Sequence, residues 1–161
     1  MVVWRLSRKA HIRQPMSGEG ARLYGGRWNH PGVPVVYTSE SLSLAVLESL
    51  VNLSIPDLPD DLFSIRIVIP DDVGYDEIRV DELAKNWRTF PAPESLKDIG
   101  SEWARKGDTS ALVVPSAVIP SERNCLINPM HTQARRIVVD AVEPFALDQR
   151  LFRKNKRPRK K

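Results

Sequence analysis

The sequence is poor in the residues that build disulfides and metal centres. It contains one cysteine, Cys125, and three histidines spread along the chain, at positions 11, 30 and 131. A single cysteine excludes an internal disulfide and a cysteine-based metal cluster. Histidines so far apart, with no carboxylate pattern nearby, lack the usual spacing of metal ligands. We therefore expect a functional site without a metal.

Long hydrophobic runs are also missing. No run approaches the roughly 20 apolar residues that a membrane-spanning helix needs, and residues 1–11 lack the apolar core and cleavage site of a signal peptide. A hydrophobic content of 42% and a charged content of 27% are typical of globular proteins. At 161 residues, the chain fits one domain. We expect a cytoplasmic protein.

Acidic residues are absent from the C-terminal end, and this makes the net charge of +4 misleading. Eight of the 24 basic residues lie within residues 150–161, so the other 16 face 20 acidic residues and the body of the chain carries −4. Such a tail is either a solvated, solubilising segment, which is the usual case, or a surface that attaches weakly to nucleic acid or to an acidic partner. The charge therefore does not indicate a nucleic-acid-binding domain.

Three common catalytic motifs are missing as well. The chain has no GxSxG elbow, no GK[ST] after its glycine clusters, and no GxGxxG between a strand and a helix. These absences argue against a hydrolase triad, a P-loop and a Rossmann domain. Ser116 lies between two prolines without a recognisable histidine base, so we interpret it as a hydrogen-bond donor to a ligand.

The most informative stretch runs from residue 18 to residue 52. Glycine has no side chain and tolerates positive φ angles, so Gly25 and Gly26 permit a ligand to approach the backbone. Arg27 follows directly, and its planar guanidinium with five donors suits a phosphate group. A surface arginine is the alternative, but the glycines before it and Trp28 after it favour anion binding.

A strand with the sequence PVVYT comes next and brings Tyr37 to its end. The tyrosine either packs in the core with its hydroxyl bonded to the backbone, or contacts the flat ring or ribose of a ligand. Ser39 or Ser41 can cap a helix over residues 42–53. Apolar residues cover nearly the whole circumference of this helix, which predicts that it is mostly buried.

Glu48 interrupts that apolar helix. A buried carboxylate costs several kcal/mol unless it is paired or used in chemistry. Glu48 is therefore either the structural partner of an arginine, with Arg27 and Arg66 as candidates, or a functional carboxylate. Its closeness in sequence to Arg27 and Tyr37 favours function.

The remaining pattern predicts an α+β domain with a mixed β core, in which strands outnumber helices. We expect strands at residues 2–7, with Trp4 in the core, and at residues 62–69. A short helix is expected at residues 81–87, capped by Asp81.

A longer helix at residues 94–106 should place Leu96, Ile99 and Trp103 on one face and end at Gly107. In the C-terminal third, we expect strands at residues 111–115, 136–142 and 144–151, with a loop at residues 116–133. Asn124 and Asn128 lie within that loop and are explained by turn formation.

Five motifs, in order, resemble the RES domain, a family named for its Arg, Glu and Ser residues. The motifs are GGRWN, a tyrosine ten residues after its arginine, LAVLE, VPSAVIPSERN and LINPMH. The family's three residues match Arg27, Glu48 and Ser116. We therefore expect a RES domain over residues 1–152 and a basic tail over residues 153–161.

The resemblance implies a fold similar to ADP-ribosyltransferase toxins of the diphtheria class. It also implies breakdown of NAD at the nicotinamide–ribose bond, by hydrolysis or phosphorolysis, while some family members ADP-ribosylate a protein. NAD would be the substrate, and Arg27, Tyr37 and Glu48 would be catalytic. The expected substrate-binding residues are Gly25, Gly26, Arg27, Trp28, Asn29, Tyr37, Ser116 and Asn128.

RES proteins are typically toxins that pair with an Xre-like helix-turn-helix antitoxin, which occludes the active site. The resemblance therefore implies an antitoxin partner here, and a homodimer is possible. We expect contact with nucleic acid only through the antitoxin or weakly through the basic tail. The rival interpretation from another class is a non-catalytic module that binds nucleic acid or a partner through the tail.

Overall fold

The computed structural model describes residues 1–51 and 59–152, so the basic tail lies outside the described residues. Among the described residues, no helix has the length and apolar character needed to cross a lipid bilayer. The elements in chain order are β1 (Val2–Arg8), α1 (Glu19–Tyr24), β2 (Val36–Ser39), α2 (Leu42–Leu50), β3 (Leu62–Val68), β4 (Tyr75–Glu77), α3 (Glu94–Lys106), β5 (Ala111–Pro115), β6 (Arg123–Ile127) and β7 (Val138–Phe145). Short 3₁₀ turns lie at Lys9–His11, Val80–Glu82, Thr132–Arg136 and Gln149–Phe152.

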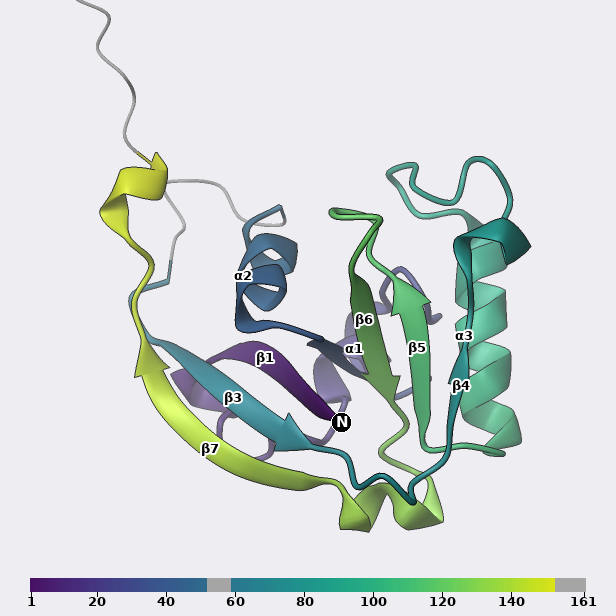
Figure 1. Cartoon of the computed structure of the whole chain (residues 1–161), viewed down its shortest axis with the longest axis horizontal. Coiled ribbons are helices and arrows are strands. Elements are labelled where there is room, and N and C mark those ends of the chain that lie inside the picture. Colours follow the sequence, from purple (N-terminus) through teal and green to yellow (C-terminus); the bar gives the residue numbers. More distant parts are fainter. Residues whose placement is uncertain (52–58, 153–161) are drawn as a thin grey trace, which may run out of the picture.

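The strands form one mixed sheet in the order β4-β5-β6-β2-β1-β3-β7. β4 runs parallel to β5, and the other neighbouring strands are antiparallel. The sheet bends, because β1, β3 and β7 run at a wide angle to β4, β5 and β6, and α2 stands between the two groups (Figure 1). The predicted α+β class with a mixed sheet is confirmed.

The side chains of β5 alternate between two hydrophobic clusters. Val113 packs in one cluster with Ile65 of β3, between the two halves of the bent sheet. Leu112 faces the other way and packs with Trp28 and Trp103. Successive strand residues point to opposite faces, so one short strand contributes to both cores. The second cluster fixes α3 and the loop around Trp28 to the sheet.

The predicted helix at residues 94–106 is confirmed as α3. It ends where Gly107 adopts a left-handed conformation with a φ of +64°. Leu96 and Trp103 are buried as expected, but Ile99 is 38% exposed and lies at the edge of the buried face. Gly100 is required by packing, since a Cβ there would lie 2.0 Å from the carbonyl oxygen of Trp28. α3 therefore contacts the Trp28 loop backbone directly.

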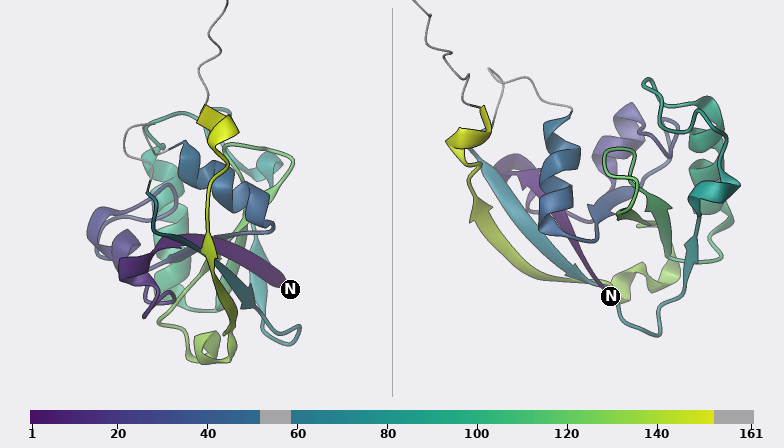
Figure 2. Two further views of the ribbon diagram at one scale, coloured as in Figure 1. Left: turned by 90° about the vertical axis from the view of Figure 1, so that its left-hand side faces the viewer. Right: turned by 45° about the horizontal axis from the view of Figure 1, so that its top comes forward.

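α2 begins as expected, because the Ser41 hydroxyl accepts a hydrogen bond from the Leu44 amide at 3.1 Å. The expectation of a mostly buried helix is wrong, however. Only Leu44 and Ala45 of α2 are buried, while Leu47 is 39% exposed. The helix lies against the sheet along one side only (Figure 2), which leaves apolar residues such as Leu47 exposed. The helix ends at Leu50, and residues 52 and 53 lie outside the described residues.

β6 corrects the expectation of a loop over residues 116–133. The strand lies inside the sheet between β5 and β2, where its Cys125 is fully buried. Burial raises the pKa of the Cys125 thiol to about 12. The run is too short to show a clear periodicity, and its strand character arises from pairing with two distant neighbours.

Three smaller expectations are also wrong. Trp4 is only half-buried, because neighbouring Val3 takes the inward-facing position on β1. The helix expected at residues 81–87 is a 3₁₀ turn at Val80–Glu82, followed by turns. Its N-cap is Arg79, whose backbone N–H donates to the Glu82 carboxylate at 2.6 Å, rather than Asp81. The strand expected at residues 136–142 is confirmed as the first part of β7. The second strand, expected at residues 144–151, is not formed, because β7 ends at Phe145 and a 3₁₀ turn follows at Gln149–Phe152.

Candidate active site

Glu48 accepts hydrogen bonds from side chains that lie far from it in the sequence. The Ser116 hydroxyl donates to Glu48 Oε1 at 2.7 Å, and the Asn124 amide donates to the same oxygen at 2.6 Å. Glu48 itself comes from the last part of α2 and is half-buried. Arg66, one of the two arginines considered as its structural partner, pairs instead with Asp140. The Glu48 carboxylate thus accepts hydrogen bonds from two uncharged side chains.

Ser116 is fully buried beneath Glu48. Its hydroxyl oxygen accepts hydrogen bonds from the backbone amides of Val118 and Ile119 at 3.1 and 2.9 Å. The same hydroxyl donates its own hydrogen bond to Glu48. The loop after β5 therefore folds around the serine and presents its hydroxyl to the carboxylate. The structure places Ser116 against Glu48 rather than on an open surface.

Asn124 is the contact that sequence reasoning missed. It lies in β6, and its amide oxygen accepts a hydrogen bond from the buried Ser39 hydroxyl at 2.7 Å. Ser39 of β2 and Asn124 are directly paired across the two strands. A strand assignment for residues 123–127 would have shown that Asn124 and Cys125 point to opposite faces. The pairing with Ser39 has no local sequence signal.

The loop carrying Arg27 is a tight turn built around two buried side chains. The Gly26 amide donates to the Asn29 carbonyl at 2.9 Å, which places Arg27 at the turn. Trp28 and Asn29 are both buried. The Asn29 amide group donates to three backbone carbonyls at 2.9 to 3.0 Å, those of Ala21, His30 and Val33. The loop is thereby fixed from inside.

Tyr37 completes this loop from the neighbouring strand. Its hydroxyl donates to the Asn29 side-chain oxygen at 2.7 Å and accepts from the Trp28 amide at 3.0 Å. Burial raises the pKa of the Tyr37 phenol well above its usual range, so the hydroxyl keeps the proton that it donates. Of the two roles considered for Tyr37, the structure shows the one in which the hydroxyl bonds to groups of the protein itself.

The two glycines before Arg27 are needed by the turn itself. Gly25 has a φ of +72°, a conformation that favours glycine. A Cβ at Gly26 would lie 2.5 Å from the Tyr37 hydroxyl oxygen. The space beside Gly26 is thus filled by Tyr37.

Arg27 is half-buried and anchored on the loop that follows the Val80–Glu82 turn. Its Nη1 donates to the carbonyl oxygens of Trp87 and Thr89 at 2.8 and 3.2 Å, and Nη2 donates to that of Thr89 at 3.3 Å. Burial lowers the pKa of the guanidinium, the negative charge of Glu48 opposes this shift, and the positive charge of Arg88 adds to it. Arg27 therefore lies within the electrostatic reach of both residues.

Arg88 is a second guanidinium that sequence reasoning missed, and its positive charge acts on Arg27. Arg88 is exposed, and its Nε donates to the Ala117 carbonyl at 3.1 Å, next to Ser116. Two neighbouring positive charges repel each other unless an anion lies between them. Arg27, Arg88 and Glu48 together offer an anion-binding group beside a carboxylate.

Asn128 is not brought to this group. It follows β6 at the opposite end from Asn124. Its side-chain amide donates to the Ala104 carbonyl at 2.8 Å, and its oxygen accepts from the Met130 amide at 3.0 Å. These bonds connect β6 to α3 and shape the turn that follows.

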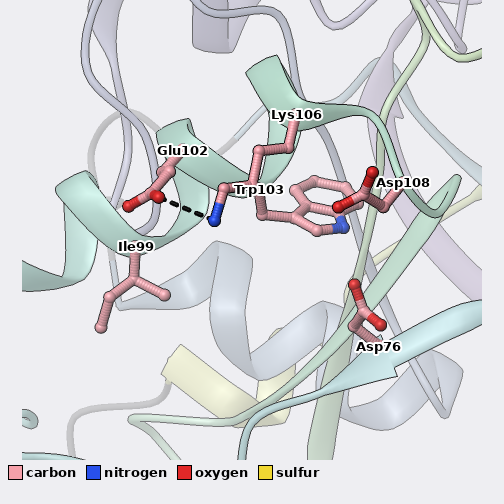
Figure 3. Close-up of a pocket in the computed structure, with 6 residues that line it drawn as sticks. All are labelled: Asp76, Ile99, Glu102, Trp103, Lys106 and Asp108. Atoms are coloured by element: carbon pink, nitrogen blue, oxygen red, sulfur yellow. Dashed lines mark ion pairs between the residues drawn. The ribbon is translucent and has the colours of Figure 1, made fainter.

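A separate pocket of about 290 Å³ lies on the surface beside α3. Figure 3 shows the six residues that line it, namely Asp76, Ile99, Glu102, Trp103, Lys106 and Asp108. Three of these are acidic, and Lys106 already pairs with Glu102 at 2.8 Å, so the pocket is poorly suited to an anionic ligand. None of the expected site residues lines it. Among the described residues, no group of three or more His, Cys, Asp or Glu is arranged to hold a metal ion.

Curated relatives match nearly the whole chain. A protein named Toxin Res from Photorhabdus laumondii is 38% identical over 158 residues, which covers 97% of this chain and all of the relative. The Prs ADP-ribosylating toxin of a Sphingobium species is 37% identical over 155 residues, covering 94% of this chain and 96% of the relative. Toxin Res from Pseudomonas putida is 37% identical over 154 residues, covering 94% of this chain and all of the relative.

A solved structure shares the fold. The crystal structure of the MbcT–MbcA toxin–antitoxin complex of M. tuberculosis contains a chain that superposes with a TM-score of 0.70 at 17% identity. The match covers 89% of this chain and 83% of the other. The family model for the RES domain matches residues 2–148. The chain therefore belongs to the RES domain family.

Proposed function

We propose that the protein is a toxin that consumes NAD by breaking its nicotinamide–ribose bond. The observation that carries this proposal is the carboxylate of Glu48. It accepts hydrogen bonds from Ser116 and Asn124, and its negative charge interacts with Arg27. This arrangement offers an anion-binding group for a pyrophosphate and a carboxylate for a sugar carbon that becomes positively charged. The names of the curated relatives support a toxin.

The reaction needs little proton transfer. As in glycoside hydrolysis, the anomeric carbon passes through an oxocarbenium-like transition state. The bond from this carbon to the nicotinamide nitrogen breaks, and its electron pair neutralises the positively charged pyridinium ring. Neutral nicotinamide then leaves without a general acid. Water or phosphate attacks the anomeric carbon, and an attacking water loses its proton to solvent.

Each site residue has a defined role in this proposal. Glu48 stabilises the developing positive charge, and Arg27 holds the pyrophosphate with Arg88 as a second contact. Tyr37 acts through the loop, because its hydroxyl bonds to the Trp28 amide and to the Asn29 side chain within the turn. Ser116 orients Glu48, since its only proton is directed to that carboxylate.

A second candidate function is transfer of ADP-ribose to a protein. It is favoured by the name of one relative, the Prs ADP-ribosylating toxin. Both functions break the same bond and differ only in the acceptor, so the roles of Glu48 and Arg27 are the same in each. A protein antitoxin partner is proposed from the toxin–antitoxin complex that shares the fold.

The test is nicotinamide release from NAD by the purified protein, with and without phosphate. Glu48→Gln should reduce release by about 100- to 1,000-fold, because one electrostatic contact to the transition state is lost. Its folding should remain intact, since glutamine keeps an oxygen that can accept from Ser116 and Asn124. Glu102→Gln, on the exposed side of α3, is the matched control and should release nicotinamide at the unaltered rate.

The outcomes separate the alternatives. Release that depends on phosphate indicates phosphorolysis, and release without phosphate indicates hydrolysis. Release only in the presence of a cell extract, with ADP-ribose found on a protein by mass spectrometry, indicates the transferase. Unchanged release by Glu48→Gln would refute the role of Glu48, and no release under any of these conditions would refute NAD consumption.

A further inference from the structure

A chain of hydrogen bonds crosses from β2 to the Glu48 carboxylate. Ser39 Oγ donates to Asn124 Oδ1 at 2.7 Å, and Asn124 Nδ2 donates to Glu48 Oε1 at 2.6 Å. Ser39 is buried and Asn124 is half-buried. All three side chains therefore meet at the edge of the core, where a misplaced polar group would be costly.

The Ser39 hydroxyl determines which way the Asn124 amide faces. An asparagine side chain can rotate by 180° and exchange its oxygen with its nitrogen. Because Ser39 donates to the oxygen, the amide nitrogen turns towards Glu48. The rotated amide would place its oxygen against the carboxylate oxygen, and two acceptors repel each other.

The register of the sheet sets this contact. Ser39 and Asn124 are direct partners in the β2–β6 ladder, and directly opposed side chains in antiparallel strands lie within contact distance. The next pair along the ladder is Thr38 with Cys125, and the Thr38 hydroxyl donates to the Cys125 carbonyl at 2.6 Å. Thr38 is thus a buried hydroxyl one position away from Ser39, but it has no bond to Asn124.

The amide and the Ser116 hydroxyl converge on one oxygen of Glu48. Two donors that reach Oε1 from different elements fix both the position of this oxygen and the plane of the carboxylate. We propose that Ser39 and Asn124 are positioning residues, which act in series to orient the Glu48 carboxylate for catalysis. The inference rests on the proposed function, because it assigns Glu48 a catalytic role.

Steady-state kinetics of nicotinamide release by the full-length chain tests this. Asn124→Ala should lower kcat on the order of 10- to 100-fold, as expected for loss of a positioning contact, with the KM for NAD within about twofold of the wild-type value. Asn124→Asp has the same shape but no amide donor and adds a second carboxylate. It should be at least as impaired as Asn124→Ala.

Ser39→Ala should lower kcat less than Asn124→Ala does, because Asn124 can still reach Glu48 in one of its two orientations. The double variant should be no slower than Asn124→Ala alone, since Ser39 acts only through Asn124. Thr38→Val, the matched control, should leave kcat unchanged. A double variant whose loss is the product of the two single losses would overturn the series arrangement, as would a rise in KM with an unaltered kcat.

A folding measurement separates this inference from the proposed function. If the wild-type protein releases no nicotinamide, the proposed function fails while the contact can still be tested. Urea unfolding of Asn124→Ala, Glu48→Ala and the double variant, in which each single change removes the hydrogen bond, should then give a coupling between the two positions. Strictly additive losses in unfolding free energy would overturn the contact itself.

Discussion

The backbone turn that carries Arg27 and the carboxylate of Glu48 are held in place in different ways, although the Arg27 guanidinium itself bonds to the distant Trp87 and Thr89 carbonyls. The turn carrying Arg27 is fixed mostly by residues near it in the sequence, with Asn29 and Tyr37 joined by one hydrogen bond. Glu48 is fixed by Ser116 and Asn124, which are separated from it by 68 and 76 residues. One part of the site is therefore assembled locally, and the other depends on the completed sheet. Variants of Arg27, Tyr37 and Arg88 test the part of the site around this turn, and the Glu48 variants test the part that depends on the sheet.

The largest expected effect is that of Arg27→Ala. It removes the proposed pyrophosphate contact and the bonds to the Trp87 and Thr89 carbonyls. Hydrogen bonds to a charged group contribute about 1.5–3 kcal/mol each, so kcat/KM for NAD should fall on the order of 10- to 100-fold. Arg27→Lys should recover little of this loss, because an ammonium lacks the planar fork.

The control for Arg27 is Arg22→Ala. Arg22 is an exposed arginine in α1 that pairs with Glu19 at 2.6 Å. Its removal should leave nicotinamide release unchanged. If Arg27→Ala keeps the wild-type kcat/KM in the same assay, the anion-binding role is wrong and the residue only ties two loops together.

Tyr37→Phe should have a smaller effect, mainly on stability. Loss of the hydroxyl leaves the Trp28 amide and the Asn29 side-chain oxygen without this partner inside the loop. An unsatisfied buried group costs about 1–3 kcal/mol, so the free energy of unfolding in urea should fall by that amount. Tyr24→Phe, at an 83% exposed tyrosine before the same turn, should unfold like the wild type.

The activity of the Tyr37 variant distinguishes an indirect role of the tyrosine from a direct one. If the tyrosine acts only through the loop, Tyr37→Phe should raise the KM for NAD through Arg27 and leave kcat within a few-fold. A severe loss of kcat at unaltered KM would instead place Tyr37 in direct contact with the reacting ribose.

The smallest expected effect is that of Arg88→Ala. Arg88 is exposed, and water and salt screen its interaction with an anion. KM for NAD should rise a few-fold at low salt and approach the wild-type value at high salt. Lys85→Ala, at another exposed cation of the same segment, should not change KM. An Arg88 effect that is independent of salt would argue for a structural role through the Ala117 carbonyl.

The local part of the site was also the part that the sequence predicts best. The sequence identified the glycine-containing loop that carries Arg27, although it predicted that Gly25 and Gly26 leave room for a ligand. Outside the site, α3 ends at Gly107 as its composition predicts. Even so, the sequence could not show that Tyr37 fills the space beside Gly26. The position of the Tyr37 side chain depends on how β2 packs against the loop.

In the part of the site that depends on the sheet, the sequence identified Glu48 but not the way in which it is held. Glu48 was identified because a carboxylate in an apolar helix is unusual, but the burial of that helix was overestimated. The composition of a helix shows that it is apolar. How much of its surface is covered by the sheet depends on tertiary packing, which the composition does not show. Asn124 was missed for a related reason, since β6 becomes a strand only between β5 and β2. Register, which pairs Asn124 with Ser39, has no local sequence signal.

The buried Cys125 thiol gives this molecule an internal reporter of unfolding. In the native protein it is inaccessible, and its pKa of about 12 keeps it protonated at the pH of ordinary assays. A cysteine in an unfolded chain has a pKa of about 8.5 and reacts readily. The rate at which a thiol reagent labels the protein therefore counts openings of the central sheet, without any added probe. The same labelling can show, for every variant above, whether lost activity reflects lost chemistry or an opened fold.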